Sequence, residues 1–162
     1  MSRSNHKRLG VGMDFSPCSI AALKWAVENF ATEGDHVILL IIRPDANYEQ
    51  GEMQLWEVTG APYIPLAEFT DAEVMKKYGI KPTPELIAVA QKAANDKKVE
   101  VLMKVFWGEP GEKICQAIES VPLETIFMGN RGLSPLQRAF MGSVSNYVVN
   151  HATCPVTVVK SK

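Results

Sequence analysis

The sequence has no long apolar run and no apolar segment near its N-terminus. A helix that spans a bilayer needs about 20 apolar residues, and no stretch of this chain approaches that length. The first residues, MSRSNHKRLGVGMDF, are polar and basic and lack the apolar centre of a signal peptide. We therefore expect a cytoplasmic protein that makes no contact with a membrane.

Cysteine and histidine are scarce, with three residues of each. Cys18, Cys115 and Cys154 are far apart and form neither a CxxC motif nor a Cys/His ligand pattern, so we expect reduced thiols and no metal site. His6 lies near the N-terminus, and the other two histidines fall at the start of a predicted strand and the end of a predicted helix. We interpret all three as structural and predict no catalytic residue.

Charge of one sign does not predominate. The chain has 17 lysines and arginines against 18 aspartates and glutamates, a formal net charge of −1 at pH 7. This balance, without a basic stripe that carries aromatic residues, argues against nucleic acid as a partner. A chain of 162 residues that is 46% hydrophobic can form a core without disulfides. We expect one domain over residues 1–162, with an insertion at about 44–82.

Two phosphate-binding motifs are missing or incomplete. The chain has no GxxxxGK[ST] loop, so it lacks the lysine and the Mg²⁺-binding hydroxyl of standard nucleoside triphosphatases. Gly10-Val11-Gly12 resembles the beginning of a dinucleotide fingerprint, but Phe15 takes the place of the third glycine and the motif begins inside a predicted strand. The sequence also indicates no general base for water, so we expect little or no phosphoryl transfer.

Apolar segments and helix-start signals alternate through the chain. Short apolar segments predict strands, and signals such as Ser16-Pro17 and Thr83-Pro84 predict the helices between them. The alternation predicts an α/β fold, a five-stranded parallel sheet with helices on both faces. We expect the flavodoxin-like strand order 3-2-1-4-5. The predicted strands are residues 9–14, 36–42, 99–107, 123–128 and 155–160.

Residues 44–82 interrupt this alternation. The segment has four prolines and no sustained period, which is typical of a long functional loop. Its aromatic residues, among them Trp56, Tyr63 and Phe69, predict a packed cover with one short helix near residues 71–78. A mobile flap is the alternative.

The predicted strand order places a ligand crevice between the first and fourth strands, where the order reverses. Asp14 at the end of the first strand is then expected beside Gly129 at the end of the fourth. Ile41 and Ile42, at the end of the second strand, could form an apolar wall for a base. For Asp14 the alternative is a structural role at the entry to the following helix.

The stretch Met128–Ser145, MGNRGLSPLQRAFMGSVS, has the composition of an anion site. Its three glycines are separated by two and by nine residues, which allows a backbone to approach a ligand closely. We expect a helix over residues 142–151, opened by Gly142-Ser143, whose N–H groups would suit a phosphate. Arg131 lies inside the loop and carries a fork suited to phosphate. Plain capping of the helix by Ser143 is the alternative.

The pattern MGNRG, nine residues, GSVS resembles the G-x2-G-x9-G-[S/T] nucleotide loop of universal stress proteins. The similarity extends to GVGMDFSP, WGEPGEKI and NHATCPVTVVK, and it is closest to the small single-domain plant members of this UspA-like family. The resemblance implies the sheet order of adenine nucleotide alpha hydrolases and a bound adenine nucleotide, AMP or ATP, with Mg²⁺ an option for ATP. The implied contacts are Met13, Asp14, Ile42, Met128, Gly129, Asn130, Arg131, Gly132, Gly142, Ser143, Val144 and Ser145.

Within this set the resemblance implies adenine against Ile42 and the Met13-Asp14 turn, and ribose near Asp14 and Gly129. It implies phosphates held by Arg131, Gly132, Gly142, Ser143, Val144 and Ser145. Asn130 stands where many members have serine, which leaves the contact of that side chain open.

The resemblance also implies a homodimer through the last strand, Pro155 to Lys160. An exposed apolar edge strand in a monomer supports this expectation, since such edges seek partners. We expect a nucleotide-dependent sensor or switch in the stress response, with at most weak ATP hydrolysis. The alternatives are a slow ATPase or other enzyme of the same fold, and an RNA-binding chaperone.

Overall fold

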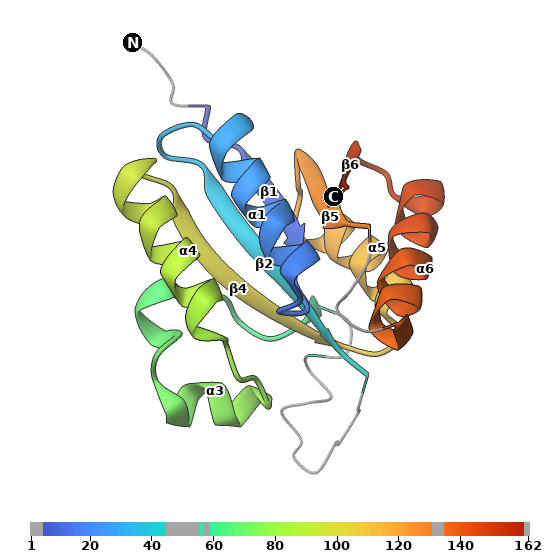
Figure 1. The fold of residues 1–162 in the computed structure, drawn as a ribbon, viewed down its shortest axis with the longest axis horizontal. Helices are drawn as coiled ribbons and strands as arrows, with labels where there is room; N and C mark the ends of the chain where they lie inside the picture. The colour runs from blue at the N-terminus through green and yellow to red at the C-terminus, as the bar shows by residue number, and fades with distance from the viewer. Residues whose placement is uncertain (1–4, 45–55, 57–58, 131–134, 161–162) are drawn as a thin grey trace.

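One mixed sheet runs through the centre of the molecule, with its six strands in the order β3-β4-β2-β1-β5-β6 (Figure 1). The computed structural model describes residues 5–44, 56, 59–130 and 135–160. All neighbouring strands pair in parallel except β3, which pairs antiparallel with β4. The strands are β1 Arg8–Gly12, β2 His36–Arg43, β3 Ile64–Pro65, β4 Glu100–Trp107, β5 Thr125–Gly129 and β6 Val156–Val159.

The parallel part of the sheet, β4-β2-β1-β5-β6, has the predicted order 3-2-1-4-5. The prediction of five strands was one short, because β3 comes from the insertion and is only two residues long. Two residues show no hydrophobic period, so the pattern could not indicate this strand. Pro65 is acceptable there because β3 is an edge strand.

Helices cover both faces of the sheet (Figure 1). On one face α1 (Pro17–Asn29), α3 (Ala72–Tyr78) and α4 (Pro84–Asp96) bury side chains in one hydrophobic cluster with alternate residues of β2, such as Val37 and Leu39. On the other face α5 (Pro110–Ser120) and α6 (Pro135–His151) pack on the intervening residues, such as Ile38 and Leu40. This alternation is the two-residue period of strands buried on both sides. None of the described helices is long and apolar enough to cross a membrane.

The described part of the insertion packs along the outer edge of β4. Ala61 N–H donates to the Val105 carbonyl at 2.9 Å, and the Lys104 ammonium donates to the Ala61 carbonyl at 2.7 Å. Lys104 is only 8% exposed, lies 4.6 Å from the centre of the Tyr63 ring, and has its pKa lowered by burial. The backbone acceptor and the aromatic ring offset part of the cost of burying this charge.

Aromatic contacts hold a second part of the insertion. Trp56 stacks on Trp107 of β4 with ring centres 5.7 Å apart, and its ring lies 5.6 Å from that of Tyr78 in α3. Phe69, just after the 3₁₀ helix Leu66–Glu68, is buried. The short helix predicted near residues 71–78 is present as α3. Residues 45–55 and 57–58 lie outside the described part, so the choice between a packed cover and a mobile flap stays open for them.

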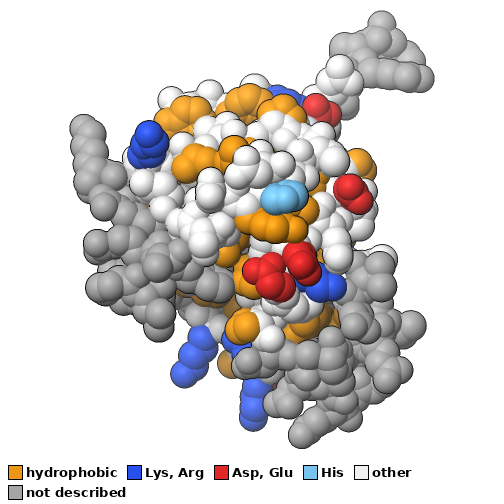
Figure 2. Space-filling model, turned by 90° about the vertical axis from the view of Figure 1, so that its right-hand side faces the viewer, with side chains coloured by type: hydrophobic (Ala, Val, Ile, Leu, Met, Phe, Trp, Pro, Cys, Tyr) orange, Lys and Arg blue, Asp and Glu red, His pale blue; other side chains and the backbone are white. Residues whose placement is uncertain are grey.

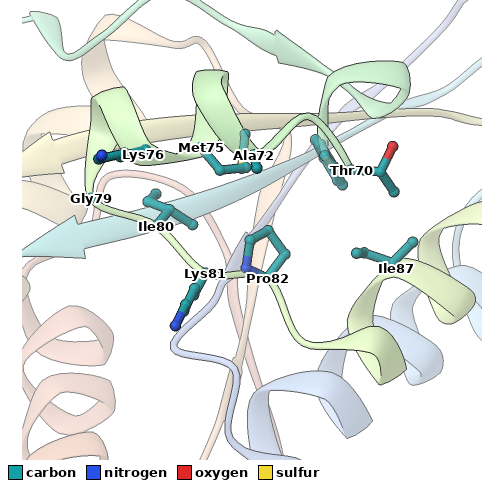
Figure 3. Close-up of a pocket in the computed structure, with 10 residues that line it drawn as sticks. Thr70, Ala72, Met75, Lys76, Gly79, Ile80, Lys81, Pro82 and Ile87 are labelled. Atoms are coloured by element: carbon teal, nitrogen blue, oxygen red, sulfur yellow. The ribbon is translucent and has the colours of Figure 1, made fainter.

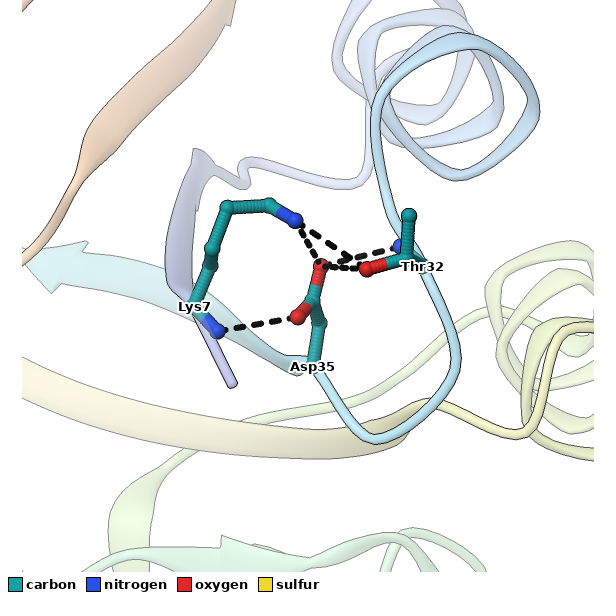
Figure 4. Close-up of polar contacts among 3 residues, drawn as sticks. All are labelled: Lys7, Thr32 and Asp35. Carbon is teal, nitrogen blue, oxygen red and sulfur yellow. Dashed lines mark hydrogen bonds and ion pairs between the residues drawn. The ribbon is translucent and has the colours of Figure 1, made fainter. Parts of the chain in front are cut away.

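A buried carboxylate joins the chain before β1 to the turn between α1 and β2 (Figure 4). Asp35 has a side chain with no exposed surface, and its oxygens accept from Lys7 N–H at 2.9 Å, from Thr32 N–H at 2.9 Å and from the Thr32 hydroxyl at 3.2 Å. The Lys7 ammonium lies 3.0 Å from the same carboxylate. Burial alone would raise the pKa of Asp35, but these hydrogen bonds and the lysine charge outweigh it, and the pKa lies below its ordinary value.

Candidate functional site

The carboxyl ends of β1 and β5 lie side by side, as the strand order predicts. Val11 is paired with Phe127, so the next residues along both strands, Gly12 and Met128, are also neighbours. A Cβ at Gly12 would lie 3.3 Å from Met128 Cε, which is a tight contact. One residue further, a Cβ at Gly129 would lie 2.7 Å from the Cys18 carbonyl oxygen. Gly129 is therefore required for the first turn of α1 to pack against the end of β5.

Asp14 follows β1 in a tight turn that leads into α1. Its Oδ1 accepts from Ser16 N–H at 3.0 Å, and Ser16 in turn caps the helix by accepting from Ser19 N–H at 3.2 Å. The alternative structural role for Asp14 is thus partly realised. The side chain is nevertheless exposed, so it can also reach a ligand above the sheet.

The turn contains an unusual backbone conformation. Phe15 has φ of 65°, in the left-handed region that side chains with a Cβ rarely adopt. Ser19, which is fully buried, donates from its hydroxyl to the Ser16 carbonyl at 2.9 Å and lies 3.4 Å from the Asp14 N–H. The strained backbone at Phe15 and the buried hydroxyl of Ser19 together fix the backbone orientation at Asp14. The sequence predicted the cap at Ser16 but not the role of Ser19, since a serine inside a helix gives no signal on its own.

The apolar residues of the predicted site are divided between the two faces of the sheet, and Met13 belongs to the cluster that α1, α3 and α4 cover. Met128 and Val144 belong to the cluster under α5 and α6, and Ile42 packs against that cluster. Ile42 is half-buried at the end of β2, so part of its side chain remains available as a wall. Met13, Met128 and Val144 are buried, so a ligand could reach them only through the backbone.

The last helix begins earlier than the sequence analysis predicted. It spans Pro135–His151, so Gly142 and Ser143 lie about two turns inside it and do not open it. The prediction was wrong because residues 136–141, LQRAFM, are good helix formers behind a proline suited to the first helical position. Free N–H groups occur only in the first turn of a helix, so this helix end supplies none at Gly142. Ser145 is buried, and its hydroxyl donates to the Gly142 carbonyl at 3.0 Å.

Gly142 differs from the other described glycines that lie within helices or strands. A Cβ at Gly142 would meet only the Asn130 carbonyl oxygen, at the ordinary distance of 3.5 Å, among the described residues. Gly111 in α5 has a clear steric reason, because a Cβ there would lie 2.7 Å from Tyr147 Cδ1. Glycine in a helix interior costs about 0.5–1 kcal/mol relative to alanine. Among the described residues, the packing around Gly142 therefore does not account for glycine at this position.

Five predicted residues thus have surface at this end of the sheet: Asp14, Ile42, Asn130, Gly142 and Ser143. Gly142 brings α6 next to Asn130, so the last helix and the end of β5 meet there. Arg131 and Gly132 lie outside the described residues. Within the described ranges no group of three His, Cys, Asp or Glu side chains could hold a metal ion. Two described cavities, of about 740 and 450 Å³, have linings that include none of the predicted site residues.

Comparisons with other proteins agree with this arrangement of the sheet. The chain is 28% identical over 168 residues to the universal stress protein PHOS34 and 30% identical over 166 residues to the universal stress protein PHOS32, both of Arabidopsis thaliana. The alignments cover 95% of this chain in both cases but 62% and 64% of the relatives. The chain therefore spans less than two thirds of the length of either relative.

Solved structures with the same fold include UspA of Lactobacillus plantarum, with a TM-score of 0.60 at 22% identity over 97% of this chain and 99% of that one. A universal stress protein family protein of Arabidopsis thaliana with AMP bound has a TM-score of 0.55 at 17% identity, over 96% and 92% of the two chains. A universal stress protein in complex with cAMP has a TM-score of 0.53 at 18% identity, over 96% and 98%.

At such identities these structures establish the shared fold. The sequence model of the universal stress protein family matches residues 5–160, which is nearly the whole chain. The chain belongs to the universal stress protein family.

Proposed function

We propose that this protein binds an adenine nucleotide, AMP, ADP or ATP, at the carboxyl ends of β1 and β5 and acts in the stress response as a nucleotide-dependent sensor or switch. The observation that carries the proposal is Gly142. It is a helical glycine without a steric reason in the described structure, and it faces the end of β5 at Asn130. A ligand that approaches the backbone of α6 closely would supply the missing reason.

The surrounding groups suit the parts of a nucleotide. Asp14 presents an exposed carboxylate that can accept hydrogen bonds from ribose hydroxyls, and Ile42 offers an apolar surface to the base. Asn130, Ser143 and the exposed side of Gly142 lie where α6 meets β5, which is where we place the phosphates. Two proteins of the same fold were crystallised with AMP and with cAMP, which supports the choice of an adenine nucleotide.

We propose that the protein holds the nucleotide and does not hydrolyse it rapidly. Two of the three histidines are engaged elsewhere: His36 lies 3.1 Å from Glu100, and His151 shares a hydrogen bond of 2.8 Å with the Tyr147 carbonyl.

A ligand that binds only the folded state stabilises it by about 2.7 kcal/mol at a hundredfold excess over Kd. For a domain of this size that corresponds to a rise in Tm of roughly 5–10 °C.

The test is to heat-denature the purified protein, analyse the supernatant by mass spectrometry, and record Tm with and without AMP, ADP or ATP. We expect a co-purified adenine nucleotide or a rise in Tm of the size given above, and no steady release of phosphate from ATP. GTP and CTP are the controls for the base. The proposal fails if no nucleotide is released and none of the three raises Tm at millimolar concentration.

We also propose a homodimer in which β6 pairs with its copy across a two-fold axis. One side of β6 pairs with β5, and all four of its residues are half-exposed. Two aromatic side chains lie nearby, Trp25 in α1 and Phe30 at the cap that follows α1. They are 40% and 41% exposed and have their rings 5.9 and 5.5 Å from that of Phe127 in β5. Hydrophobic side chains are grouped near the top of the face in Figure 2, at the height where Figure 1 shows β6. Such an edge favours pairing with a second copy.

Replacing Val158 with lysine is expected to convert the dimer to a monomer, because it places a charge in the proposed interface. The measurement is the molar mass by light scattering after size-exclusion chromatography, with circular dichroism as the check on the fold. Val89→Lys on α4 is the matched control, because Val89 is also half-buried and α4 lies far from β6 (Figure 1), and it should leave the mass unchanged. A wild-type protein that elutes as a monomer, or a Val158→Lys protein that remains a dimer, would contradict the pairing through β6.

A further inference from the structure

A cavity of about 740 Å³ lies beneath α3, between that helix and the start of α4 (Figure 3). Its apolar lining comes from Phe69, Met75, Ile80, Pro82 and Ile87. The volume is in the range of about 300–1,000 Å³ that is usual for pockets that hold small molecules. None of the residues of the proposed nucleotide site takes part in the lining, so the cavity is a separate feature.

The charges on the lining are of one sign. Lys76 and Lys81 are exposed members of it, and none of its described residues is acidic. Neither lysine forms an ion pair with another described residue. The second described cavity, between α1 and α4, has Glu28 and Asp96 on its lining beside three lysines. Of the two described cavities, the one beneath α3 is therefore the one that combines apolar walls with a positive charge that no described residue compensates.

The helix itself explains only part of this charge. Lys76 lies in the last turn of α3, where a cation complements the helix dipole. Lys77, its neighbour, lies over the rings of Trp56 and Tyr78, at 5.8 and 6.0 Å from their centres. Lys81 comes after Gly79, at which the helix has already ended in a left-handed cap. The dipole of α3 thus gives no reason for a second cation at Lys81.

The walls of the cavity are held firmly by the described structure. Asp71 caps α3 by accepting from Glu73 N–H at 3.0 Å and from Val74 N–H at 3.3 Å. Met75 and Tyr78 anchor the same helix in the core, and Gly79 packs close to the Arg43 guanidinium. A preformed pocket spares a ligand the cost of ordering its site.

We propose that this cavity binds an amphipathic monoanion with an unbranched apolar body, of the class of medium- and long-chain carboxylates. The apolar body would lie against Met75, Ile80 and Ile87, and the carboxylate would lie at the rim near Lys76 and Lys81. This assignment is independent of the proposed nucleotide site, and either can fail without the other.

The test uses 11-(dansylamino)undecanoate as a fluorescent probe and decanoate as its competitor. We expect saturable enhancement of dansyl fluorescence, displacement by decanoate, and much weaker displacement by decyltrimethylammonium, which has a similar chain but the opposite charge. The double variant Lys76→Gln/Lys81→Gln should weaken decanoate binding about five-fold, the loss expected for two exposed ion pairs. It should leave displacement by 1-decanol unchanged, because that ligand has no charge.

Two further variants locate the binding. Ala72→Phe fills the cavity from α3, and Ile87→Asp places a carboxylate on its apolar wall; each is expected to abolish probe binding while circular dichroism and Tm report a folded protein. Lys92→Gln/Lys97→Gln, which alters the other described cavity, is the matched control and should bind the probe as the wild type does. Absence of saturable binding, unchanged binding in both cavity variants, or equal binding of decanoate and decyltrimethylammonium would overturn the proposal.

Discussion

Nucleotide binding is expected to be lost when Gly142 is replaced by valine, while the fold remains intact. A Cβ at this position meets only the Asn130 carbonyl oxygen at 3.5 Å among the described residues, so the branched side chain would project into the space assigned to the phosphates. Valine is also a slightly better helix former than glycine. The free protein should therefore not lose stability, and the rise in Tm caused by the nucleotide should disappear.

Gly142→Ala distinguishes the effect of this position on helix stability from its effect on nucleotide binding. Removing a helical glycine should increase the free energy of unfolding of the nucleotide-free protein by about 0.5–1 kcal/mol, since alanine restricts the unfolded chain and favours the helix. The same change should reduce nucleotide affinity, though less than valine does. Thermal or urea unfolding of the free protein and calorimetric titration with AMP or ATP measure the two effects.

Gly111→Ala is the matched control for this experiment. It is also a glycine in a helix, but a Cβ there would lie 2.7 Å from Tyr147 Cδ1, so α5 and α6 would have to shift. We expect this variant to lose stability and to keep its affinity for the nucleotide, which is the opposite result. If Gly142→Val binds the nucleotide as tightly as the wild type, Gly142 does not belong to the site.

Among the substitutions proposed for this protein, Asp35→Ala is expected to cause the largest decrease in the free energy of unfolding. The carboxylate is fully buried and is the shared acceptor for Lys7 and Thr32, so its removal leaves two backbone N–H groups without their partner. Breaking such a buried charged network costs about 3 kcal/mol. In a domain of this size the loss corresponds to a decrease in Tm of roughly 6–12 °C. Asp96→Asn, a substitution at an exposed aspartate at the end of α4, should change Tm little.

The contribution of Asp35 depends on pH in a definite direction. Its pKa in the folded protein is lower than its ordinary value, so the unfolded chain binds the proton more readily. The stabilisation is present above the ordinary carboxyl pKa and is lost as pH falls through the lowered one. The difference in stability between wild type and Asp35→Asn should therefore be largest near neutral pH and should shrink in acid. A difference that stays constant down to acid pH would show that the charge of Asp35 is not what stabilises the turn.

The order of the parallel strands could be predicted from the sequence because it depends on local signals. Apolar segments such as 36–42 and helix starts such as Ser16-Pro17 can each be recognised from a few consecutive residues. The rules for crossover connections then determine how the predicted strands are ordered in the sheet. That the carboxyl ends of β1 and β5 are neighbours followed from that order alone, and the pairing of the two strands in the structure confirms it.

Contacts between distant segments could not be predicted in the same way. The hydrogen bonds between Lys7 and Asp35, and the burial of Lys104 beneath Ala61, join residues far apart in sequence. The left-handed conformation of Phe15 is imposed by its surroundings, because the residue type itself disfavours it. The start of α6 was wrong for a different reason: the glycine at 142 was interpreted as a boundary, although the residues before it form helix readily.

The short strand β3 limits how this molecule can associate. A sheet with two open edges can add copies at both sides without end, as in a growing fibre. Here the two-residue strand β3, which contains Pro65, and the Lys104–Ala61 hydrogen bond occupy part of the outer edge of β4, so among the described strands β6 offers the longer open edge to a partner. Pairing through β6 would use that edge in both copies and leave a third chain only the short edge at β3. Assembly through the sheet would then stop at two chains, and the insertion would serve as the terminator of polymerisation.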